Sequence, residues 1–361
     1  MKPLICFYRD NQYIYSNNYV LHTCKAEVQV SEFLNSMEAE FKNELKIIQI
    51  NFEYENTRLF SDKIELYPAD KASVFVLNEY QILSQPQLFN KIPSTITTLI
   101  HQFKPLEEKE NFISKIGKIK KEISAGRLYQ VNLTAPLVSE SNYSAEIIFK
   151  NYFDKFSGLY KALLPLAHYE LISFSPELFL KKQQNKLITQ PIKGSLANSA
   201  DFANELIGNP KEEAELSMIV DLLRNDFNRI EESNSARVSV HRAPLKLGYI
   251  QHTYSEIEIE TFKNLSQILK ATLPGGSISG CPKIESLKVI SELEPYKRQA
   301  YTGTLGWWKD NNFCLNLTIR SFMKAQNNLF YHAGCGIVYD SIAEKEWNEF
   351  ILKTGSLNVQ R

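Results

Sequence analysis

The chain has 361 residues, 43% of them hydrophobic and 23% charged, which is enough apolar material for a large globular core. Its 41 basic and 41 acidic residues cancel and form no basic stripe, which argues against nucleic-acid binding. No apolar run is long enough to span a membrane, the N-terminus does not resemble a signal peptide, and five scattered cysteines are typical of reduced thiols. We therefore expect a cytoplasmic protein without nucleic-acid or membrane partners.

The first half of the chain reads mostly as strands. Residues 1–95 alternate short β-like runs with polar turns and contain no group that suggests chemistry. Segment 104–126 has apolar residues at helical spacing and ends on Gly126, a suitable residue just after a helix. Strands are predicted for "RLYQVNLTAPL", "YELISFSP" and "ELFLKKQQNKLITQPIK", the last folded through "QQN" as a hairpin. We expect a short N-terminal region, 1–95, packed on the same fold as a domain of residues 96–361.

The second half mixes helices and strands. "GNPKEEAELSMIVDLLRNDFNRI" predicts an amphipathic helix with Asn209 as N-cap and Pro210 in its first position. A glycine-rich loop opens a second helix in "LPGGSISGCPKIESLKVISELEP", and "GTLGWW", "FCLNLTIRSFM" and "LFYHAGCGIVYDS" predict strands. Ser341 and Glu344 have capping-box spacing for a last helix that stops at Gly355. Because the elements show no βαβ rhythm, we predict the α+β class.

Two predicted helices carry paired glutamates. Glu212 and Glu215 lie three residues apart on one helix, and Glu346 and Glu349 repeat the spacing on the last helix, with Lys353 four residues further on. This spacing stacks side chains on one helix face. Two such helices can form an oxygen-rich site for a hard divalent cation, although similar pairs also decorate many solvated helices. Both interpretations stay open at this point.

Two glycine-rich segments invite a functional interpretation. Gly275, Gly276 and Ser277 begin "GGSISG", where backbone N–H groups at a helix start can bind an anion, and a plain tight turn is the alternative. Cys335 in "AGCGIV" lacks the G-x-C-x-G frame of a glutamine amidotransferase nucleophile, and no "HxE" signature follows. We interpret Cys335 as a small strand residue, so the chain is not expected to release ammonia from glutamine itself.

Three further polar residues are ambiguous on their own. Lys193 in "ITQPIKGS" fits a solvated strand end or a buried reactive amine. Glu177 in "SFSPELF" fits a turn or a catalytic acid, and His252 in "IQHTYSEIE" fits a satisfied core histidine or a catalyst. Neither composition nor spacing decides between the two interpretations of each residue.

Taken together, the motifs resemble the chorismate-utilising enzymes, most closely the synthase subunits (component I) of aminodeoxychorismate synthases. The resemblance runs from about Ile113 to Lys353 and keeps the family's order through "YQVNLT", "SFSPELFL", "PIKGS", "AELSMIVDLLRND", "LPGGSISGCPKIESLKVISELEP", "YTGTLGW", "NLTIRSF", "AGCGIVYDS" and "EWNEFILK". It implies one large α+β domain with two facing, mainly antiparallel sheets flanked by helices, and residues 96–361 would be its chorismate-binding catalytic part.

The resemblance also implies roles for individual residues. Mg²⁺ would bridge chorismate carboxylates and glutamates of two helices, drawn from Glu212, Glu215, Glu346 and Glu349, with Glu215 and Glu349 the better candidates. Glu177 would protonate the departing C4 hydroxyl, and His252 would lie near the ring. The substrate carboxylates would be held by the side chains or backbone of Tyr301, Arg320, Lys353, Gly334, Gly336, Gly275, Gly276 and Ser277.

Two positions distinguish the reactions within this family. Members that add water to chorismate have a lysine where this chain has Gln130, which disfavours an isochorismate or salicylate synthase. Anthranilate synthases have "PIAG" where this chain has "PIKG"; in aminodeoxychorismate synthases that lysine, here Lys193, is understood to attack C2, and ammonia then enters at C4. A desolvated lysine beside positive charge can become nucleophilic.

We therefore predict Mg²⁺-dependent amination of chorismate to 4-amino-4-deoxychorismate, on the route to para-aminobenzoate and folate. Ammonia would come from a separate glutamine amidotransferase subunit, and a separate lyase would remove pyruvate. The main alternative is anthranilate synthase component I, which shares every feature except Lys193. A non-catalytic regulatory subunit that only binds chorismate is a third hypothesis, disfavoured by the presence of Glu177, Lys193 and both glutamate pairs.

Overall fold

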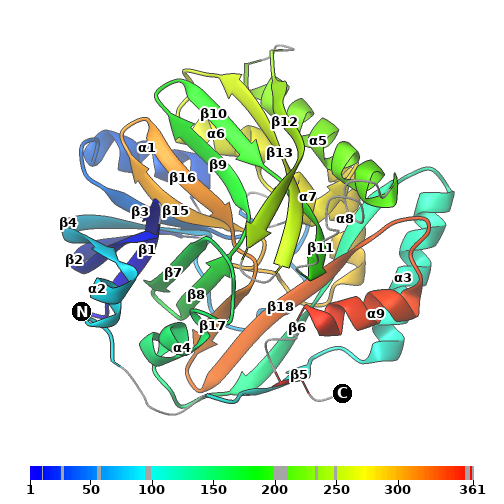
Figure 1. The fold of residues 1–361 in the computed structure, drawn as a ribbon, viewed down its shortest axis with the longest axis horizontal. Helices are drawn as coiled ribbons and strands as arrows, with labels where there is room; N and C mark the ends of the chain where they lie inside the picture. The colour runs from blue at the N-terminus through cyan, green and yellow to red at the C-terminus, as the bar shows by residue number, and fades with distance from the viewer. Residues whose placement is uncertain are drawn as a thin grey trace.

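The computed structural model describes residues 1–9, 11–25, 28–54, 58–93, 99–197, 210–231, 235–247, 250–353 and 358–359. It confirms the α+β class, because a large and mainly antiparallel sheet is flanked by helices (Figure 1). The N-terminal part contributes β1 (Leu4–Arg9), β2 (Gln12–Cys24), α1 (Val30–Glu40), β3 (Lys46–Ile50), β4 (Ala72–Ser84) and α2 (Gln85–Phe89).

The middle of the chain contains most of the short strands. These elements are β5 (Gln102–Pro105), α3 (Lys109–Ser124), β6 (Gln130–Glu140), α4 (Ala145–Tyr152), β7 (Tyr160–Pro165), β8 (Glu170–Ser175), β9 (Leu178–Gln183), β10 (Lys186–Gln190) and β11 (Ile192–Ala197).

The last part of the chain contains the longest helix and returns to the sheet several times. Its elements are α5 (Pro210–Glu231), β12 (Arg237–Leu247), β13 (Ile250–Glu260), α6 (Leu265–Thr272), α7 (Gly276–Ser279), β14 (Gly280–Cys281), α8 (Lys283–Leu293), β15 (Thr304–Lys309), β16 (Asn312–Leu317), β17 (Ser321–Ala325), β18 (Asn328–Ile337), α9 (Ala343–Leu352) and β19 (Asn358–Val359).

The strand pairings form one continuous antiparallel path. It runs β13–β10–β9–β16–β15–β3–β4–β2–β1–β7–β8–β17–β18–β6–β5. Strands β11 and β12 also pair with β13, and β14 pairs with β6. The N-terminal strands β1 to β4 therefore occupy the middle of the sheet. A boundary at residue 95 stays a prediction, since strands from both sides of it hydrogen-bond to each other.

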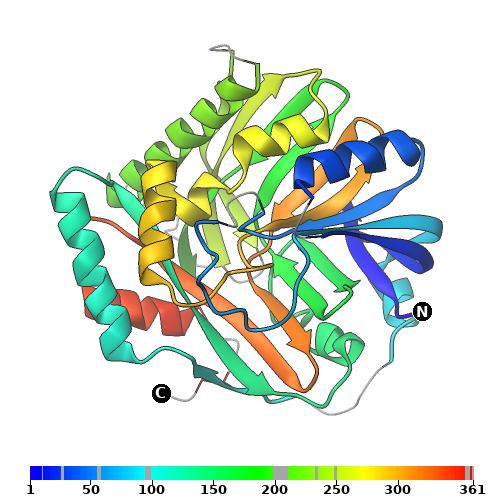
Figure 2. The same cartoon turned by 180° about the vertical axis from the view of Figure 1, so that it is seen from behind.

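The two arms of this path share one connected hydrophobic core. Leu315 of β16, Leu133 of β6 and Leu216 of α5 all belong to it, and each is fully buried. Helices α1, α5, α6 and α8 lie over the face seen in Figure 2. Within the described residues no helix is both long and apolar enough to cross a membrane. The apolar positions of the strands thus hold the arms together and bring their end strands near each other.

Several sequence predictions of local structure are confirmed. The β9–β10 hairpin turns at Gln184, which has a φ of 54°. Helix α5 begins at Pro210, while Asn209 and Gly355 lie outside the described residues. Gly126 follows α3 with a φ of +76°, and its N–H donates to the Ile123 carbonyl at 2.9 Å.

Two predicted helix starts are wrong. Helix α3 begins at Lys109 because the preceding residues, Gln102–Pro105, form β5 and pair with β6. Helix α9 has Ile342 rather than Ser341 at its N-cap position. The Ser341 hydroxyl instead accepts the Val338 N–H at 3.1 Å, so it closes the turn after β18 rather than capping the helix.

Candidate active site

The two ends of the sheet approach each other at the short helix α7. On the β6 side, the Asn132 side-chain amide donates to the Ile278 carbonyl of α7 at 3.0 Å, and Asn132 lies opposite Gly336 of β18. On the other side, α7 packs on α5 so closely that a Cβ at Gly276 would lie 2.5 Å from a methyl carbon of Leu222. A side chain at position 276 would therefore have to displace Leu222. The arrangement brings β11, α7 and β18 into one neighbourhood.

One part of this neighbourhood is an acid–amine group, made of Glu177, Ser277 and Lys193. Glu177 lies between β8 and β9, is 7% exposed, and accepts a hydrogen bond from the Ser277 hydroxyl at 2.9 Å. Burial raises the pKa of Glu177 to about 7, against the opposing effects of the Ser277 hydrogen bond and the positive charge of Lys193. Glu177 can thus carry a proton near neutral pH, as a general acid must.

Lys193 lies on β11, half buried, with its backbone held by β13. Its Cα pairs with that of Thr253, whose hydroxyl donates to the Lys193 carbonyl at 3.1 Å. Its positive charge lowers the pKa of Glu177, in opposition to burial. His252 precedes Thr253 on β13 and pairs with Leu245 of β12, and the β11–β13 register is irregular between Lys193 and Leu196. His252 thus lies on the strand that pairs with Lys193, and a catalytic role for it stays a prediction.

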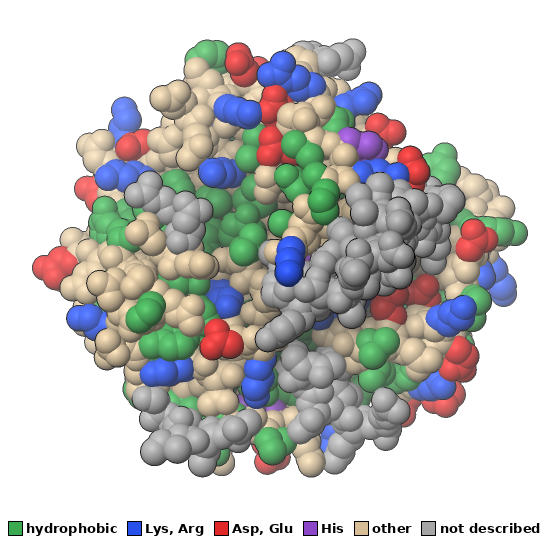
Figure 3. All heavy atoms as spheres, in the orientation of Figure 1, with side chains coloured by type: hydrophobic (Ala, Val, Ile, Leu, Met, Phe, Trp, Pro, Cys, Tyr) green, Lys and Arg blue, Asp and Glu red, His purple; other side chains and the backbone are tan. Residues whose placement is uncertain are grey.

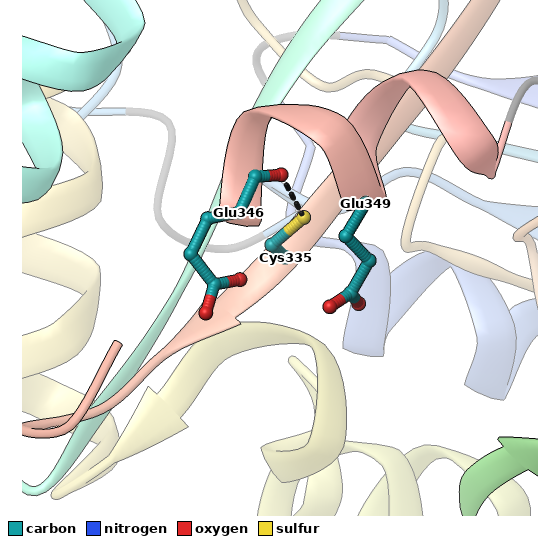
Figure 4. Close-up of side chains that lie close together, drawn as sticks. All are labelled: Cys335, Glu346 and Glu349. Atoms are coloured by element: carbon teal, nitrogen blue, oxygen red, sulfur yellow. Dashed lines mark hydrogen bonds between the residues drawn. The ribbon is translucent and has the colours of Figure 1, made fainter. Parts of the chain in front are cut away.

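The second part is a carboxylate–cation group, which lies where α9 crosses β18. Figure 4 shows the carboxylates of Glu346 and Glu349 pointing the same way from α9, on either side of Cys335. One ligand atom of each of these three residues lies within 4.8 Å of the others. The Cys335 thiol donates to the Glu346 carbonyl at 3.2 Å, and burial raises its pKa to about 12. The thiol therefore stays neutral, and the two carboxylates are the anionic ligands on offer.

Lys353 connects this group to the strand beneath it. Its ammonium donates to the Gly334 carbonyl at 2.8 Å and pairs with the Glu349 carboxylate at 2.7 Å. The Arg320 guanidinium in turn donates to the Lys353 carbonyl. Arg320 has a φ of 52°, a left-handed conformation that a non-glycine residue adopts only under local constraint.

Tyr301 lies next to this group in the interior. It is 5% exposed, and burial raises the pKa of its hydroxyl, while the charges of Arg298 and Arg320 lower it. Its ring lies 5.1 Å from that of His332. Tyr301 therefore offers a buried hydroxyl that stays neutral, and its contact with a substrate carboxylate stays a prediction.

The remaining predicted metal ligands lie on α5. Glu215 is half buried there, and the side chain of Glu212 lies outside the described part of the chain. The structure thus brings Glu346 and Glu349 together, whereas participation of the α5 glutamates in the same metal site stays a prediction. Figure 3 shows acidic side chains in a recess over α9 on this face of the molecule.

Sequence reasoning missed Arg298, which ties the site together. Arg298 is 1% exposed and donates to the Ile278 carbonyl at 2.8 Å, to the Asn132 carbonyl at 2.6 Å and to both oxygens of Glu294. It therefore locks α7 to β6. By spacing, Glu294 and Arg298 look like a surface i,i+4 helix pair. The signal against this was Pro295 between them, because proline cannot continue a helix.

Gln130, which the sequence singled out as distinguishing reactions, begins β6 and is 1% exposed. A Cβ at Gly336 would lie 2.5 Å from the Gln130 side-chain nitrogen, so the amide packs on the bare backbone of β18. Its side-chain oxygen accepts no hydrogen bond within the described residues. This position therefore carries a neutral amide, and not the lysine ammonium expected of a member that adds water to chorismate.

The fold and this constellation of residues define a chorismate-binding enzyme. The family model described as "chorismate binding enzyme" matches residues 35–358, and the chain belongs to this family. It is 34% identical over 253 residues to aminodeoxychorismate synthase component 1 of Bacillus subtilis, covering 68% of this chain and 54% of the relative. It is 30% identical over 258 residues to anthranilate synthase component 1 of Aquifex aeolicus, covering 69% and 52%.

Solved structures agree on the fold. Anthranilate synthase component I from Streptococcus pneumoniae superposes with a TM-score of 0.85 at 23% identity, covering 97% of this chain and 92% of that one. A putative isochorismate synthase, DhbC from Bacillus anthracis, gives 0.77 at 19% identity, covering 98% and 94%. The matched region spans only 54% to 59% of the first curated relatives. Family and fold are therefore shown, and the particular reaction is a matter for proposal.

Proposed function

We propose that this protein aminates chorismate at C4, giving 4-amino-4-deoxychorismate, the reaction of an aminodeoxychorismate synthase component I on the route to para-aminobenzoate and folate. The observation that carries the proposal is the buried acid Glu177, which accepts a hydrogen bond from Ser277 and whose pKa is lowered by the charge of Lys193 on β11. An acid and a nucleophile that act on opposite parts of one ring must lie on a common site. The similarity to aminodeoxychorismate synthase component 1 supports the same choice.

The proposed first step uses both members of the acid–amine group. Glu177 gives its proton to the C4 hydroxyl, which leaves as water. The Lys193 ammonium first gives a proton to solvent, and the resulting amine forms a bond to C2. The two ring double bonds shift toward C4, and the new C2-bound nitrogen loses one proton. Burial of Glu177 favours the protonated acid that this step needs, because its pKa is raised to about 7.

The proposed second step reverses the double-bond shift. Ammonia bonds to C4 and loses one proton, the Lys193 nitrogen takes up one proton as the electron pair of the C2–N bond returns to it, and the diene is restored with an amino group at C4. The neutral amide of Gln130 at the start of β6 suits this step, because it supplies no base to activate water. Water addition, as in an isochorismate or salicylate synthase, is disfavoured for the same reason.

The carboxylate–cation group fits a magnesium-dependent site. Glu346 and Glu349 offer the hard oxygen ligands that Mg²⁺ prefers, and the protonated sulfur of Cys335 is unsuited to it. Bound Mg²⁺ would neutralise the substrate carboxylates and fix their position. Around them, Arg320, Lys353 and Tyr301 would orient the dianion, with the Gly334 and Gly336 backbone and the Gly275–Ser277 loop beside it.

Ammonia would come from a separate glutamine amidotransferase subunit. A glutaminase nucleophile must be a reactive thiolate, and burial holds the pKa of Cys335 at about 12. The thiols of Cys6, Cys24, Cys281 and Cys314 also have raised pKa values, each chiefly because of burial. The chain's own cysteines thus offer no alternative, and external ammonium should replace the partner in an assay.

A product assay tests the proposal against its main alternative, anthranilate synthase component I. The similarity to the Aquifex aeolicus enzyme supports this alternative. The purified protein is given chorismate, Mg²⁺ and ammonium, with and without an added aminodeoxychorismate lyase. We expect para-aminobenzoate only when the lyase is present. Fluorescent anthranilate formed without the lyase would refute C4 amination, and absence of any chorismate turnover would favour a purely regulatory, chorismate-binding subunit.

A further inference from the structure

A cavity of about 550 Å³ lies on the outer side of α9, where this helix meets the start of α3 and the end of β5. Its volume is within the range of small-molecule sites, roughly 300–1,000 Å³. Residues of α9 form one wall, and the segment from Pro105 to Lys109 forms the other. None of the residues assigned above to chorismate or to the metal lines it.

The α9 wall is apolar and partly open. Trp347 is held against Phe112 and Phe350, with ring centroids 5.5 and 5.2 Å away. Leu352 is 73% exposed although it lines the cavity, which is unusual for a leucine next to a formed pocket. This wall is suited to an aromatic or branched apolar group.

The opposite wall is acidic. The Glu107 carboxylate is buried and pairs with Lys115 through one oxygen, while its other oxygen accepts no hydrogen bond within the described residues. Glu108 is exposed and forms no ion pair with a described residue, and Lys109 is already paired with Glu344 at 2.7 Å. The cavity is thus lined by two carboxylates and one ammonium group, and one negative charge is left over when the ion-pair partners Lys115 and Glu344 are counted as well.

The helical period separates this cavity from the candidate active site. Glu346, Glu349 and Lys353 share one face of α9, where the carboxylates flank Cys335 and Lys353 reaches Gly334. Positions 347, 348, 351 and 352 fall on the opposite face at about 100° per residue, and all four line the cavity. The same short helix thus presents two unrelated surfaces.

We propose that the cavity outside α9 is a second small-molecule site, and that its ligand is a small organic cation, a protonated primary amine on an aromatic or branched apolar body. The ammonium would meet the exposed carboxylate of Glu108, with the buried negative charge of Glu107 behind it, and the apolar body would lie against Trp347 and Leu352. An anion would be repelled by the acidic wall, and a neutral apolar molecule would leave the Glu108 carboxylate without a cationic partner. The proposal is independent of which reaction the enzyme catalyses.

The test is equilibrium binding of 2-phenylethylammonium to the full chain, followed by saturation-transfer NMR or calorimetry. For a ligand of this size we expect a Kd on the order of 1 mM or below. The neutral analogue 2-phenylethanol and the anion phenylacetate should bind at least about tenfold more weakly, because they cannot pair with the acidic wall. Equal binding of all three, or no binding of the cation at 10 mM, on the order of ten times that Kd, would overturn the proposal.

Two surface variants locate the site without disturbing the core. Leu352→Arg puts a fixed cation at the mouth of the cavity and should weaken binding at least about tenfold, and Glu108→Gln should weaken it about threefold. Phe262→Arg is the matched control, because Phe262 is 81% exposed and lies away from the cavity. Unchanged affinity in Leu352→Arg, or an equal loss in Phe262→Arg, would place the bound cation elsewhere and refute the site; melting curves verify that each variant is folded.

Discussion

The acid–amine group and the carboxylate–cation group handle charge in opposite ways. Glu177 is enclosed, accepts one hydrogen bond from the neutral Ser277 hydroxyl, and has a pKa raised to about 7 by burial. Glu349 has a half-exposed side chain and a cation within 2.7 Å, and its neighbour Lys353 is fixed by a second bond to Gly334. The first environment suits a proton that must leave, and the second suits charges that must stay. Because a low dielectric penalises an isolated charge, one enzyme can keep both states within a single site.

The largest expected effect on activity comes from removing the amine of Lys193. Lys193→Ala should reduce C4 amination by about 10³-fold or more, because a covalent step without its nucleophile loses most of its rate acceleration. Product formation from chorismate and ammonium, coupled to a lyase, measures it. The control is Lys186→Ala, an exposed lysine on β10 that pairs with Glu258, which should stay within about twofold. Amination at the normal rate in Lys193→Ala would rule out the lysine as nucleophile.

Glu177→Gln should reduce the rate by about 10²- to 10⁴-fold, since the amide cannot donate the proton that the leaving hydroxyl needs. In the unchanged protein, activity should fall as pH rises through about 7, where Glu177 loses its proton. A rate that is flat from pH 6 to 9 in the unchanged enzyme would contradict an acid role for this carboxyl.

The same substitution should have the opposite effect on stability. The folded pKa of Glu177, about 7, is above its ordinary value of 4.5, so the folded state binds the extra proton and stability falls as pH rises between these values. Glu177→Gln should therefore raise the free energy of unfolding at pH 8, by about 1–3 kcal/mol, and change it little at pH 4.5. Denaturant unfolding at both pH values measures the difference; a destabilised variant at pH 8 would show that the carboxylate is not strained by burial.

Glu349→Gln probes the second group and should raise the Mg²⁺ concentration for half-maximal activity by about 10- to 100-fold, with a smaller effect at saturating Mg²⁺. Glu344→Gln is the matched control, since Glu344 lies on the same helix but is exposed and pairs with Lys109. A Mg²⁺ titration of the activity of both variants measures this concentration and shows whether only Glu349→Gln changes it. Equal shifts in the two would mean that general negative charge, and not a ligand, had been lost.

The smallest effect concerns Ser277. Its hydroxyl donates to Glu177 and lowers the pKa of that carboxyl, so Ser277→Ala should raise the Glu177 pKa further. The alkaline limb of the pH–rate profile should move upward by about 0.4–1 pH unit, the size expected for one hydrogen bond. Ser277→Thr, which keeps a hydroxyl, should restore the original limb. A downward shift in Ser277→Ala would contradict the assigned direction of this hydrogen bond.

Local sequence predicted local structure where the signal was itself local. Pro210 began α5, Gly126 followed α3 with a positive φ, and the "QQN" turn joined β9 to β10. The wrong predictions concern segments that form hydrogen bonds outside the predicted helix. Residues 102–105 were drawn into β5 by pairing with β6, and Ser341 closed a turn instead of capping α9. Tertiary pairing outweighs propensities of a few tenths of a kcal/mol per residue.

The sequence by itself determined the membership in the family, because ordered motifs of fixed residue type carry that information, and it identified Glu177, Lys193, Glu346 and Glu349 as chemically apt. Only the tertiary structure decided that Glu177 is enclosed and hydrogen-bonded to Ser277, that the Cys335 thiol stays neutral, and that the buried Arg298 side chain joins α7 to β6. The physical reason is that pKa and ion pairing depend on burial and on neighbours distant in the chain, and the folded sheet creates both when its two ends meet.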